Sequence, residues 1–305
     1  MLRVASHNIN GIRAGLRRGF GTWLTGRDCD VVALQEVRCP IAALPAGAFG
    51  DYHLAYDAGD LAGRNGVAVL TRRPPEAVRT WSGSALLRPP GGESLDVSAA
   101  PVGVLARGLG EFATQGRYVE VDLADDRVTV ASLYVPKGGL PAHLQRPGRM
   151  REAPDGGARY ERKMRFLRAV ARQLTRARRG ARARGRQYLL LGDLNVAHTR
   201  FDVAQWRRNQ NSEGFLPIER AWLDEVIGPR RLVDVVRRLH PLTDGPYSWW
   251  SWMGNSFAND TGWRIDYHLA SAGLAGRAIR AGTDRDPAPD RRISDHAPVV
   301  VDYDL

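Results

Sequence analysis

An apolar run that ends in an acid and an amide is the first chemical signal in the sequence. In "LLLGDLNVAH", the residues from Tyr188 to Leu191 suit a buried strand, and Asp193 and Asn195 follow directly. Burying a carboxylate there costs several kcal/mol unless a cation, a donor network or water meets it. A capping acid in a turn would explain one such case. Whether the pattern recurs therefore decides between a turn and a site.

The pattern recurs in five further segments, each with a polar or ionisable side chain at or near an end of an apolar run. They contribute Asn8 and Asn10 in "RVASHNIN", Glu36 in "VVALQE", Tyr134 in "VTVASLYVP", Asp266 in "WRIDYHLAS", and Asp295 and His296 in "SDHAPVVVDY". Six strand ends of this kind indicate one sheet edge where these side chains converge. Converging carboxylates repel one another, so a hard divalent cation with oxygen ligands is their expected companion.

The elements that must position these residues are strands in runs, with helices between them. Strands are expected up to Asn10, at 31–35, near Tyr52, at 66–71 and 77–82, on both sides of a turn at 124–126, up to Asn195, and in "YSWWSW", "WRIDYHLAS", "AIRAGTD" and "APVVVDYDL"; helices are expected at 12–25, within 161–186, and from Pro217. This order predicts an α/β protein of two packed sheets flanked by helices. Segment 83–112 is expected to be a long surface excursion and 136–157 a loop.

The chain is expected to form one domain over residues 1–305. No linker or change in composition divides it, and the candidate residues run from Asn8 to His296. No apolar segment is long enough to span a bilayer, and the first residues lack a signal-peptide core. Cys29 and Cys39 lack metal or redox spacing, so free thiols in a reducing cytoplasm are expected.

The positive charge of the chain is concentrated in one segment. Lys and Arg outnumber Asp and Glu by 44 to 33, and residues 161–186 hold eleven basic residues and one acid. Apolar residues recur there at helical spacing, which predicts an amphipathic helix with an arginine-rich outer face; they are Met164, Phe166, Leu167, Val170 and Leu174. Such a face is either solvated or in contact with nucleic acid, so charge permits a nucleic-acid partner without proving one.

Nine motifs together resemble exonuclease III and the apurinic/apyrimidinic endonucleases, within the endonuclease/exonuclease/phosphatase superfamily. They are "SHNINGIRA", "LQEVRC", "GRYVEVDL", "YVP", "GDLNVAH", "GFLPIERAWLD", "YSWWSW", "GWRIDY" and "SDHAPV". The metal-site motifs would also suit DNase I-like, sphingomyelinase or inositol-phosphatase relatives, whereas "GFLPIERAW" and "GWRIDY" resemble the DNA-repair branch. The resemblance implies a DNase I-like four-layer α-β-β-α sandwich with mainly antiparallel sheets. It also implies a monomeric enzyme that uses Mg²⁺, with Mn²⁺ as a substitute.

The same resemblance implies roles for individual catalytic residues. Glu36 matches the main metal-binding carboxylate, with Asn8, Asn10 and Asp295 nearby. The other matches are Asp193 and Asn195, the acid and amide that position or deprotonate the attacking water; His296, the catalytic histidine; Asp266, its carboxylate partner; and Tyr134, a phenol at the scissile phosphate or leaving oxygen. From the residues alone, either Asp193 or His296 could be the base, and a protonated His296 could instead clamp the phosphate.

Substrate contacts are also implied by the resemblance. Trp249, Trp263 and Ile265 fall where the family builds an apolar pocket for a base-less sugar, and Asn209 and Asn211 lie in a DNA-contacting loop.

Three positions depart from the family pattern. Lys137 replaces an amide that contacts the substrate, His7 stands where an aromatic residue is frequent, and Trp249 stands where phenylalanine is common. Trp250 and Trp252 alternate with Trp249 and are expected to pack away from the pocket.

The leading functional hypothesis is a magnesium-dependent nuclease of double-stranded DNA that nicks 5′ to abasic sites and trims 3′ ends. One alternative is a phosphatase or phospholipase of the same superfamily, which would lack the tryptophan pocket. Another is a non-catalytic nucleic-acid-binding relative, which would tolerate loss of Glu36, Asp193 or His296; all three are present.

Overall fold

Two β-sheets form the centre of the computed structural model, which describes residues 1–61, 63–92, 95–97, 100–148 and 152–305. The eight-stranded sheet has the order β14-β15-β1-β2-β4-β3-β6-β7 and the seven-stranded sheet the order β12-β13-β11-β10-β9-β5-β8. The strands are β1 (Leu2–Asn8), β2 (Val31–Gln35), β3 (His53–Asp57), β4 (Val67–Thr71), β5 (Ala77–Thr80), β6 (Ala85–Arg88), β7 (Leu95–Val97), β8 (Ala100–Pro101), β9 (Tyr118–Asp122), β10 (Val128–Tyr134), β11 (Gln187–Asp193), β12 (Val233–Asp234), β13 (Asp266–Ala270), β14 (Ala278–Thr283) and β15 (Val299–Tyr303).

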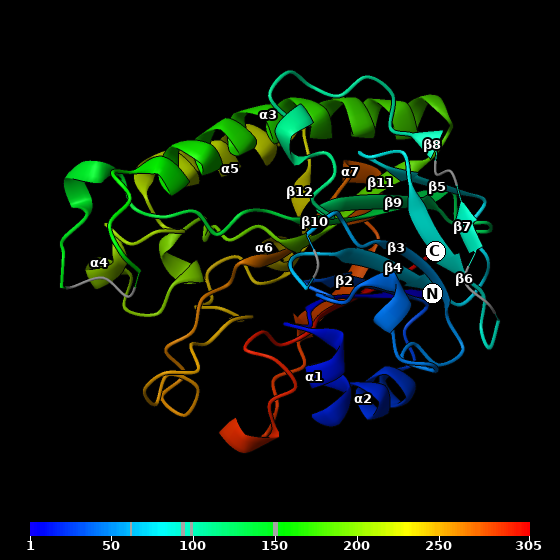
Figure 1. The fold of residues 1–305 in the computed structure, drawn as a ribbon, viewed down its shortest axis with the longest axis horizontal. Helices are drawn as coiled ribbons and strands as arrows, with labels where there is room; N and C mark the ends of the chain where they lie inside the picture. Colours follow the sequence, from blue (N-terminus) through cyan, green and yellow to red (C-terminus); the bar gives the residue numbers. More distant parts are fainter. Residues whose placement is uncertain (62, 93–94, 98–99, 149–151) are drawn as a thin grey trace.

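Helices cover the outer face of each sheet, as Figure 1 shows, with α3 and α5 on one side and α1 and α2 on the other. The α-helices are α1 (Ile12–Arg17), α2 (Phe20–Arg27), α3 (Ala158–Ala183), α4 (Trp206–Asn209), α5 (Pro217–Val226), α6 (Val235–Leu239) and α7 (Ala272–Ala275); the short 3₁₀ helices are η1 (Ile41–Ala43), η2 (Gly110–Phe112), η3 (Ala142–Leu144), η4 (Arg200–Asp202) and η5 (Pro289–Arg291). The fold is therefore the expected four-layer sandwich. Among the described residues, no helix is long and apolar enough to cross a membrane.

Most paired strands are antiparallel, but two parallel pairs place the candidate residues. β1 runs parallel to β2, and β10 runs parallel to β11. Parallel neighbours need a crossover connection, which α1 and α2 provide in the first case and α3 in the second. Because parallel strands end at the same edge, Asn8 lies opposite Gln35 and Tyr134 lies opposite Asp193. Antiparallel β13 begins at this edge, where Asp266 is paired with Asp193.

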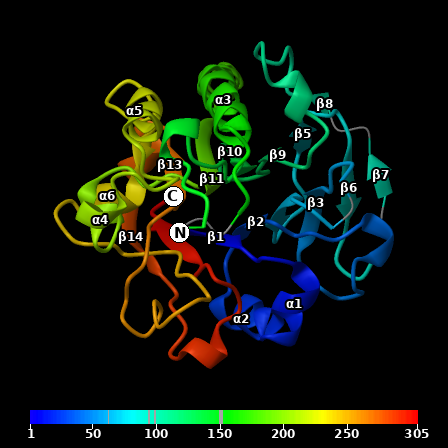
Figure 2. The same cartoon turned by 60° about the vertical axis from the view of Figure 1, so that its left-hand side comes forward.

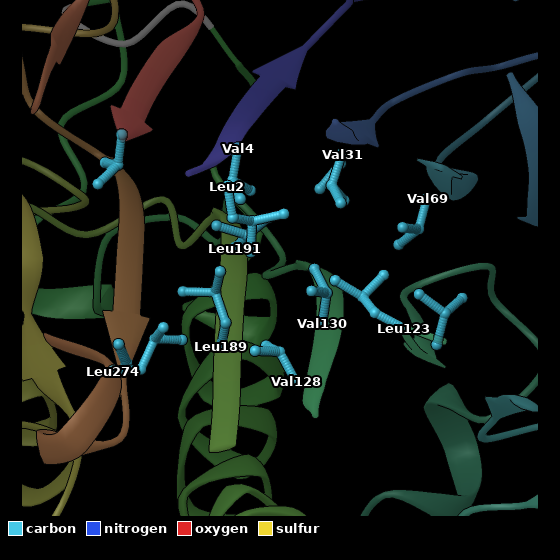
Figure 3. Packing of buried hydrophobic residues seen from close by; sticks show 14 of the residues in the cluster. Leu2, Val4, Val31, Val69, Leu123, Val128, Val130, Leu189, Leu191 and Leu274 are labelled. Atoms are coloured by element: carbon cyan, nitrogen blue, oxygen red, sulfur yellow. The ribbon is translucent and has the colours of Figure 1, made fainter. Parts of the chain in front are cut away.

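The unbroken apolar run of β11 follows from burial on both of its faces. Leu189 and Leu191 belong to the core between the two sheets, together with Val128 and Val130 of β10 (Figure 3). Leu190, which alternates with them, belongs to the core beneath α3 and α5. A strand covered on both faces has no polar-out positions until it ends. This is why the first acidic side chain of the segment, Asp193, marks the sheet edge.

The basic segment forms α3, and its predicted apolar stripe lies in the core beneath it. Most arginines of α3 point away from that core, for example Arg168, Arg172 and Arg179, which are not buried. Lys163 departs from the pattern because it is wholly buried, although it belongs to the most basic helix of the chain. Cys29 and Cys39 are buried and free, as expected.

Three expectations about local structure were wrong. The helix expected at 12–25 is divided into α1 and α2, because Gly19 adopts a left-handed conformation with φ of 101°. "YSWWSW" forms no strand; Trp249 makes only isolated bridges. Segment 83–112 is not simply a surface excursion, because β6 pairs with β3 and extends a sheet. Residues 93–94, 98–99 and 149–151 of the two expected loops lie outside the described residues.

Candidate active site

A cleft of about 750 Å³ opens at the edge where β1, β2, β10 and β11 end. In Figure 2, β1, β10 and β11 lie between α3 and α2. The predicted residues that line the cleft are Asn10, Glu36, Tyr134, Lys137, Asp193, Asn195, Trp249, Trp263, Ile265, Asp295 and His296. Asn8 and Asp266 are wholly buried and form hydrogen bonds with Glu36 and His296, which line the cleft. The convergence predicted from the strand ends is therefore present in the structure.

Asn8 joins the acids of the two sheets. Its Nδ2 donates to Glu36 Oε1 at 2.8 Å and to Asp193 Oδ2 at 2.9 Å. Its Oδ1 accepts from the backbone N–H of Asn10 at 3.1 Å. One buried amide thus holds two carboxylates from different sheets within reach of each other, which is the opposite of what their mutual repulsion would favour.

The groups around Glu36 fit a hard cation. Glu36 Oε2 is buried and has no hydrogen-bond partner among the described residues, although the Arg38 guanidinium forms an ion pair with it. Asn10 Nδ2 donates to Asp295 Oδ1 at 2.7 Å, and Arg38 donates to Asn10 Oδ1 at 2.6 Å. Carboxylate and amide oxygens are the ligands preferred by Mg²⁺ and Mn²⁺. These residues could hold such an ion.

Asp193 is held by donors from the turn that follows it. The backbone N–H of Asn195 donates to Asp193 Oδ1 at 2.8 Å, and Asn195 Nδ2 lies 3.2 Å from Oδ2. Asn195 adopts a left-handed conformation with φ of 49°, which is uncommon for a residue other than glycine. Burial, together with the neighbouring carboxylates of Asp266 and Glu36, raises the pKa of Asp193 to about 7, although His296 opposes the shift.

His296 and Asp266 form a buried pair beside Asp193. His296 Nδ1 lies 2.9 Å from Asp266 Oδ2, and its Nε2 lies 3.9 Å from Asp193 Oδ2. Burial alone would lower the pKa of His296, but the ion pair and hydrogen bond with Asp266 outweigh burial and raise this pKa to about 10. The imidazole is therefore charged at neutral pH.

A second group of possible ligands overlaps the first. Asp193, Asp266 and His296 each offer an atom within 4.8 Å of the others, an arrangement that could also hold a metal ion. However, Asp266 does not line the cleft, and its Oδ2 already meets both His296 and Ser248 Oγ, the latter at 2.6 Å. We therefore regard the Glu36 side, which faces the cleft, as the better position for an ion.

Tyr134 places its phenol between these acids. Its side chain is almost wholly buried yet reaches the cleft, where Glu36 and Asp193 are close enough to influence its phenol. Burial, with Glu36 and Asp193 nearby, holds the pKa of Tyr134 well above its ordinary value. The phenol therefore remains protonated and can donate a hydrogen bond.

An aromatic wall adjoins the acids. The rings of Trp249 and Trp263 meet edge to face with centroids 6.4 Å apart, and Ile265 packs with them. Trp249 Nε1 donates to Asp295 Oδ2 at 3.1 Å. A phenylalanine could not make this bond, so the tryptophan ties the apolar wall to the acidic one.

Several cleft residues were not identified from the sequence. Arg38, Glu213 and Trp252 also line the cleft. Because Trp252 lines the cleft, the expectation that it packs away from the pocket was wrong, whereas Trp250 is buried as expected. Arg38 follows Glu36 by two residues in "LQEVRC", which is the one signal that could have identified it.

The two asparagines expected in a DNA-contacting loop do not line the cleft. Asn209 Nδ2 lies within 3.4 Å of the carbonyl oxygens of Ala204 and Gln205, so it holds its own loop together, and Asn211 is exposed nearby. Lys137 does line the cleft, where its Nζ lies 3.1 Å from Glu213 Oε1.

An adjacent cavity of about 700 Å³ carries net positive charge. It is lined by Arg200, Arg207, Arg208, Trp206, Tyr247 and Asp244, among others. Trp206 packs against the same apolar cluster as Trp249 and Trp263, so residues of this cavity and of the cleft are in contact with one cluster.

Residues 5–296 match the Endonuclease/Exonuclease/phosphatase family, and the chain belongs to that family. It is a hydrolase of this family. It is 25% identical over 299 residues to an exodeoxyribonuclease of Bacillus subtilis, an alignment that covers 98% of each chain. It is 28% identical over 277 residues to the DNA repair nuclease APEX1 of Danio rerio, covering 90% of this chain and 74% of that protein.

The fold is shared with solved structures as well. An AP endonuclease from Archaeoglobus fulgidus matches with a TM-score of 0.75 and 24% identity over the whole of both chains. The family resemblance and the fold class inferred from the sequence are confirmed.

Proposed function

We propose that this chain is a magnesium-dependent DNA-repair nuclease that incises the strand 5′ to an abasic site and removes nucleotides or blocking groups from 3′ ends. The observation that carries the proposal is one cleft lined by two kinds of side chain. Glu36, Asp193 and His296 supply ionisable groups, and Trp249 and Trp263 supply indole rings. The names of relatives, an exodeoxyribonuclease and a DNA repair nuclease, support the same substrate class.

The proposed ion is Mg²⁺, with Mn²⁺ as a substitute, held by Glu36 with Asn8, Asn10 and Asp295 nearby. Oxygen ligands alone favour a hard cation. When bound, such an ion neutralises charge on the phosphate and stabilises the leaving oxygen. Because the guanidinium of Arg38 is paired with Glu36, an ion that binds there must share or displace that contact.

Asp193 is the proposed base for the attacking water. Its raised pKa makes it a better proton acceptor near neutral pH than an ordinary aspartate. Asn195 and Asn8 hold the carboxylate in place through their hydrogen bonds. His296 is charged and suits a clamp on the phosphate, and Asp266 orients its ring. Tyr134 donates a hydrogen bond from its phenol to the phosphate or to the leaving oxygen.

The aromatic wall accounts for a preference for abasic sites. A base-less sugar turned out of the duplex presents an apolar ring edge, which Trp249, Trp263 and Ile265 can cover. A nucleotide that keeps its base is larger and costs more to unstack. Lys137 stands at the rim, where its ammonium can meet a backbone phosphate.

We further propose one catalytic unit over residues 1–305 that acts as a monomer in the cytoplasm. The candidate residues come from both ends of the chain, since Asn8 and His296 contribute to one cleft. Nothing in this arrangement requires a residue from a second copy.

A gel assay tests the proposed function. Duplex DNA with one abasic-site analogue is incubated with the protein in Mg²⁺ or in EDTA and resolved on a denaturing gel. We expect one product cut 5′ to the analogue in Mg²⁺ only, and slower shortening of a matched duplex with normal bases. Absence of incision in both Mg²⁺ and Mn²⁺, with a folded protein, would refute the proposal.

A further inference from the structure

Lys163 is buried beside the turn that follows Asp193 and contains Asn195, which we call the catalytic turn. It lies on α3, a helix whose other basic side chains are at least partly exposed. All residues of α3 are described, and Lys163 is its one wholly buried basic side chain. Its Nζ lies 2.6 Å from Glu219 Oε1 of α5 and donates to the carbonyl oxygen of Asn195 at 2.8 Å. The ammonium therefore links α3, α5 and the catalytic turn.

Stability is in general a weak explanation for a buried ion pair such as this one. Lysine is almost never wholly buried unless it is paired, because desolvating an ammonium is costly. Apolar residues of similar volume often replace such pairs without loss of stability. The presence of a charged side chain here therefore points to a local role for its ammonium group. The hydrogen bond from this group to the carbonyl oxygen of Asn195 is the contact that reaches a residue of the cleft.

The surroundings of the pair are built to admit it. A Cβ at Gly138, where φ is 87°, would lie 2.4 Å from Lys163 Cδ, so only glycine leaves room for the lysine stem. On the other side, a Cβ at Gly214 would lie 3.1 Å from the carbonyl oxygen of Asn195. That oxygen is thus enclosed between Gly214 and the lysine ammonium.

Glu219 is fixed independently of the lysine. Its Oε2 accepts from the backbone N–H of Leu216 at 3.0 Å, at the start of α5. Glutamate in the first turn of a helix is also favoured by the helix dipole. The lysine is therefore anchored to a carboxylate that belongs to α5 and has its own backbone contact there.

We propose that Lys163 is a positioning residue for catalysis. By holding the carbonyl of Asn195, its ammonium keeps that residue in its left-handed conformation, so that the Asn195 N–H and amide stay on Asp193. Asp193 then keeps the orientation in which it meets the attacking water. The inference rests on the proposed function and adds to it the residue that fixes the geometry of the base.

The first test is the kinetics of K163M and K163R on abasic DNA. We expect K163M to lower kcat roughly 10- to 100-fold, as for other groups that orient a catalytic residue, with KM changed less than about twofold. K163R keeps a charged donor and should recover part of kcat. Wild-type kcat in K163M would overturn the inference.

K163M leaves Glu219 buried and unpaired, so the double variant K163M/E219Q provides a folded alternative. The glutamine introduced by E219Q keeps an oxygen for the N–H of Leu216 while removing the charge. The matched control is R79M. It removes an arginine of β5 that is paired with Asp122 of β9, in the seven-stranded sheet that also contains β11. We expect the double variant to keep the low kcat of K163M, and R79M to keep wild-type kcat below its melting temperature.

A readout independent of activity separates this inference from the proposed function. Hydrogen exchange of the peptide that contains residues 193–197 should become at least about tenfold faster in the double variant and stay unchanged in R79M. Unchanged exchange, or equal loss of kcat in both variants, overturns the positioning role. Failure of the wild-type protein to incise abasic DNA would refute the proposed function, and the exchange comparison would still decide whether Lys163 holds the turn.

Discussion

The imidazole of His296 is fixed by Asp266 at a distance of 2.9 Å between Nδ1 and Oδ2, and both side chains are almost wholly buried. Ser248 Oγ donates to the same carboxylate oxygen at 2.6 Å, so the carboxylate is itself held in place. The ring can therefore present only Nε2 toward Asp193 and the cleft. Because the pair raises the pKa of His296 to about 10, it presents a charged donor rather than a neutral acceptor.

Removal of the imidazole should damage catalysis more than removal of its partner's charge. We expect H296N to lower kcat roughly 10²- to 10⁴-fold. D266N should have a milder effect, because the asparagine oxygen can still accept a hydrogen bond from Nδ1 of the charged imidazole. Single-turnover rates on abasic DNA measure both. Equal damage in the two variants would indicate that Asp266 acts directly on the substrate or the metal ion.

Trp263 should control the preference for a missing base rather than the cleavage step itself. It meets Trp249 and Phe215 edge to face at the wall of the cleft. We expect W263A to lower abasic-site incision at least about tenfold more than it lowers 3′-end trimming, because both reactions use the same acids. Circular dichroism provides the folding control. A proportional loss of both activities would make Trp263 a support for the sheet edge instead.

The convergence of the acids could be predicted from the sequence, because a strand that is buried on both faces accommodates an ionisable side chain mainly at its ends. Asp193 and Glu36 each follow a run of buried residues, and parallel pairing brings such ends to one edge. Helical spacing places Lys163 on the apolar face of α3, three and seven residues before Phe166 and Val170, but it does not show what accommodates a charged side chain there. Its burial depends on Glu219 and on Gly138, which come from distant segments of the chain.

The tryptophan segment shows a different limit. "YSWWSW" has the composition of a strand, yet Trp249 makes only isolated bridges to Trp263 and His296. Trp252 is exposed at the cleft because the chain does not continue the alternation of a strand beyond Trp250. Successive side chains point to opposite faces only where a strand forms. Whether a strand forms depends on a neighbouring strand with free backbone N–H and C=O groups.

The arginines near the cleft should grip DNA more than the arginines of α3. Two of the latter are already engaged, since Arg172 and Arg176 donate to the carbonyl oxygens of Arg107 and Val104. We expect R172E/R176E/R179E to change the slope of log K against log salt by less than about one. We expect R200A/R207A/R208A, which strips the adjacent cavity of its positive charge, to reduce the slope by about two to three.

Fluorescence anisotropy with a duplex carrying an abasic analogue, in EDTA and over a salt series, measures both slopes. The two triple variants serve as controls for each other, because each removes three arginines. If the α3 variant lost the larger part of the slope, the DNA would lie along that helix and the proposed path through the cleft would need revision.

His7 should make stability depend on pH. Burial lowers the pKa of His7 from 6.5 to about 3, and its Nδ1 has no hydrogen-bond partner among the described residues. The unfolded chain therefore binds a proton below about pH 6.5 that the folded protein does not bind. The free energy of unfolding is therefore unaffected by His7 above that pH. It decreases as the pH falls from 6.5 toward 3, and the decrease reaches about 2 kcal/mol near pH 5.

The variant H7F removes this dependence and suits a position between Phe20 and Trp23. Urea unfolding near pH 5 and pH 7.5 should show a fall in the free energy of unfolding that is about 2 kcal/mol smaller in H7F than in the wild type. H143Q, at an exposed histidine, should behave as the wild type does. An identical pH dependence in H7F would show that His7 takes up a proton in the folded protein.

The most direct test of the account is single-turnover incision of abasic duplex DNA by E36A and D193N at saturating Mg²⁺, with DNA binding measured separately. Glu36 and Asp193 are the two acids that Asn8 holds together, one on the proposed ion and the other on the water. We predict that each variant loses roughly 10²- to 10³-fold or more in rate, while folding and DNA affinity change little. Near-normal rates in both variants would contradict the assignment of this cleft as the catalytic site.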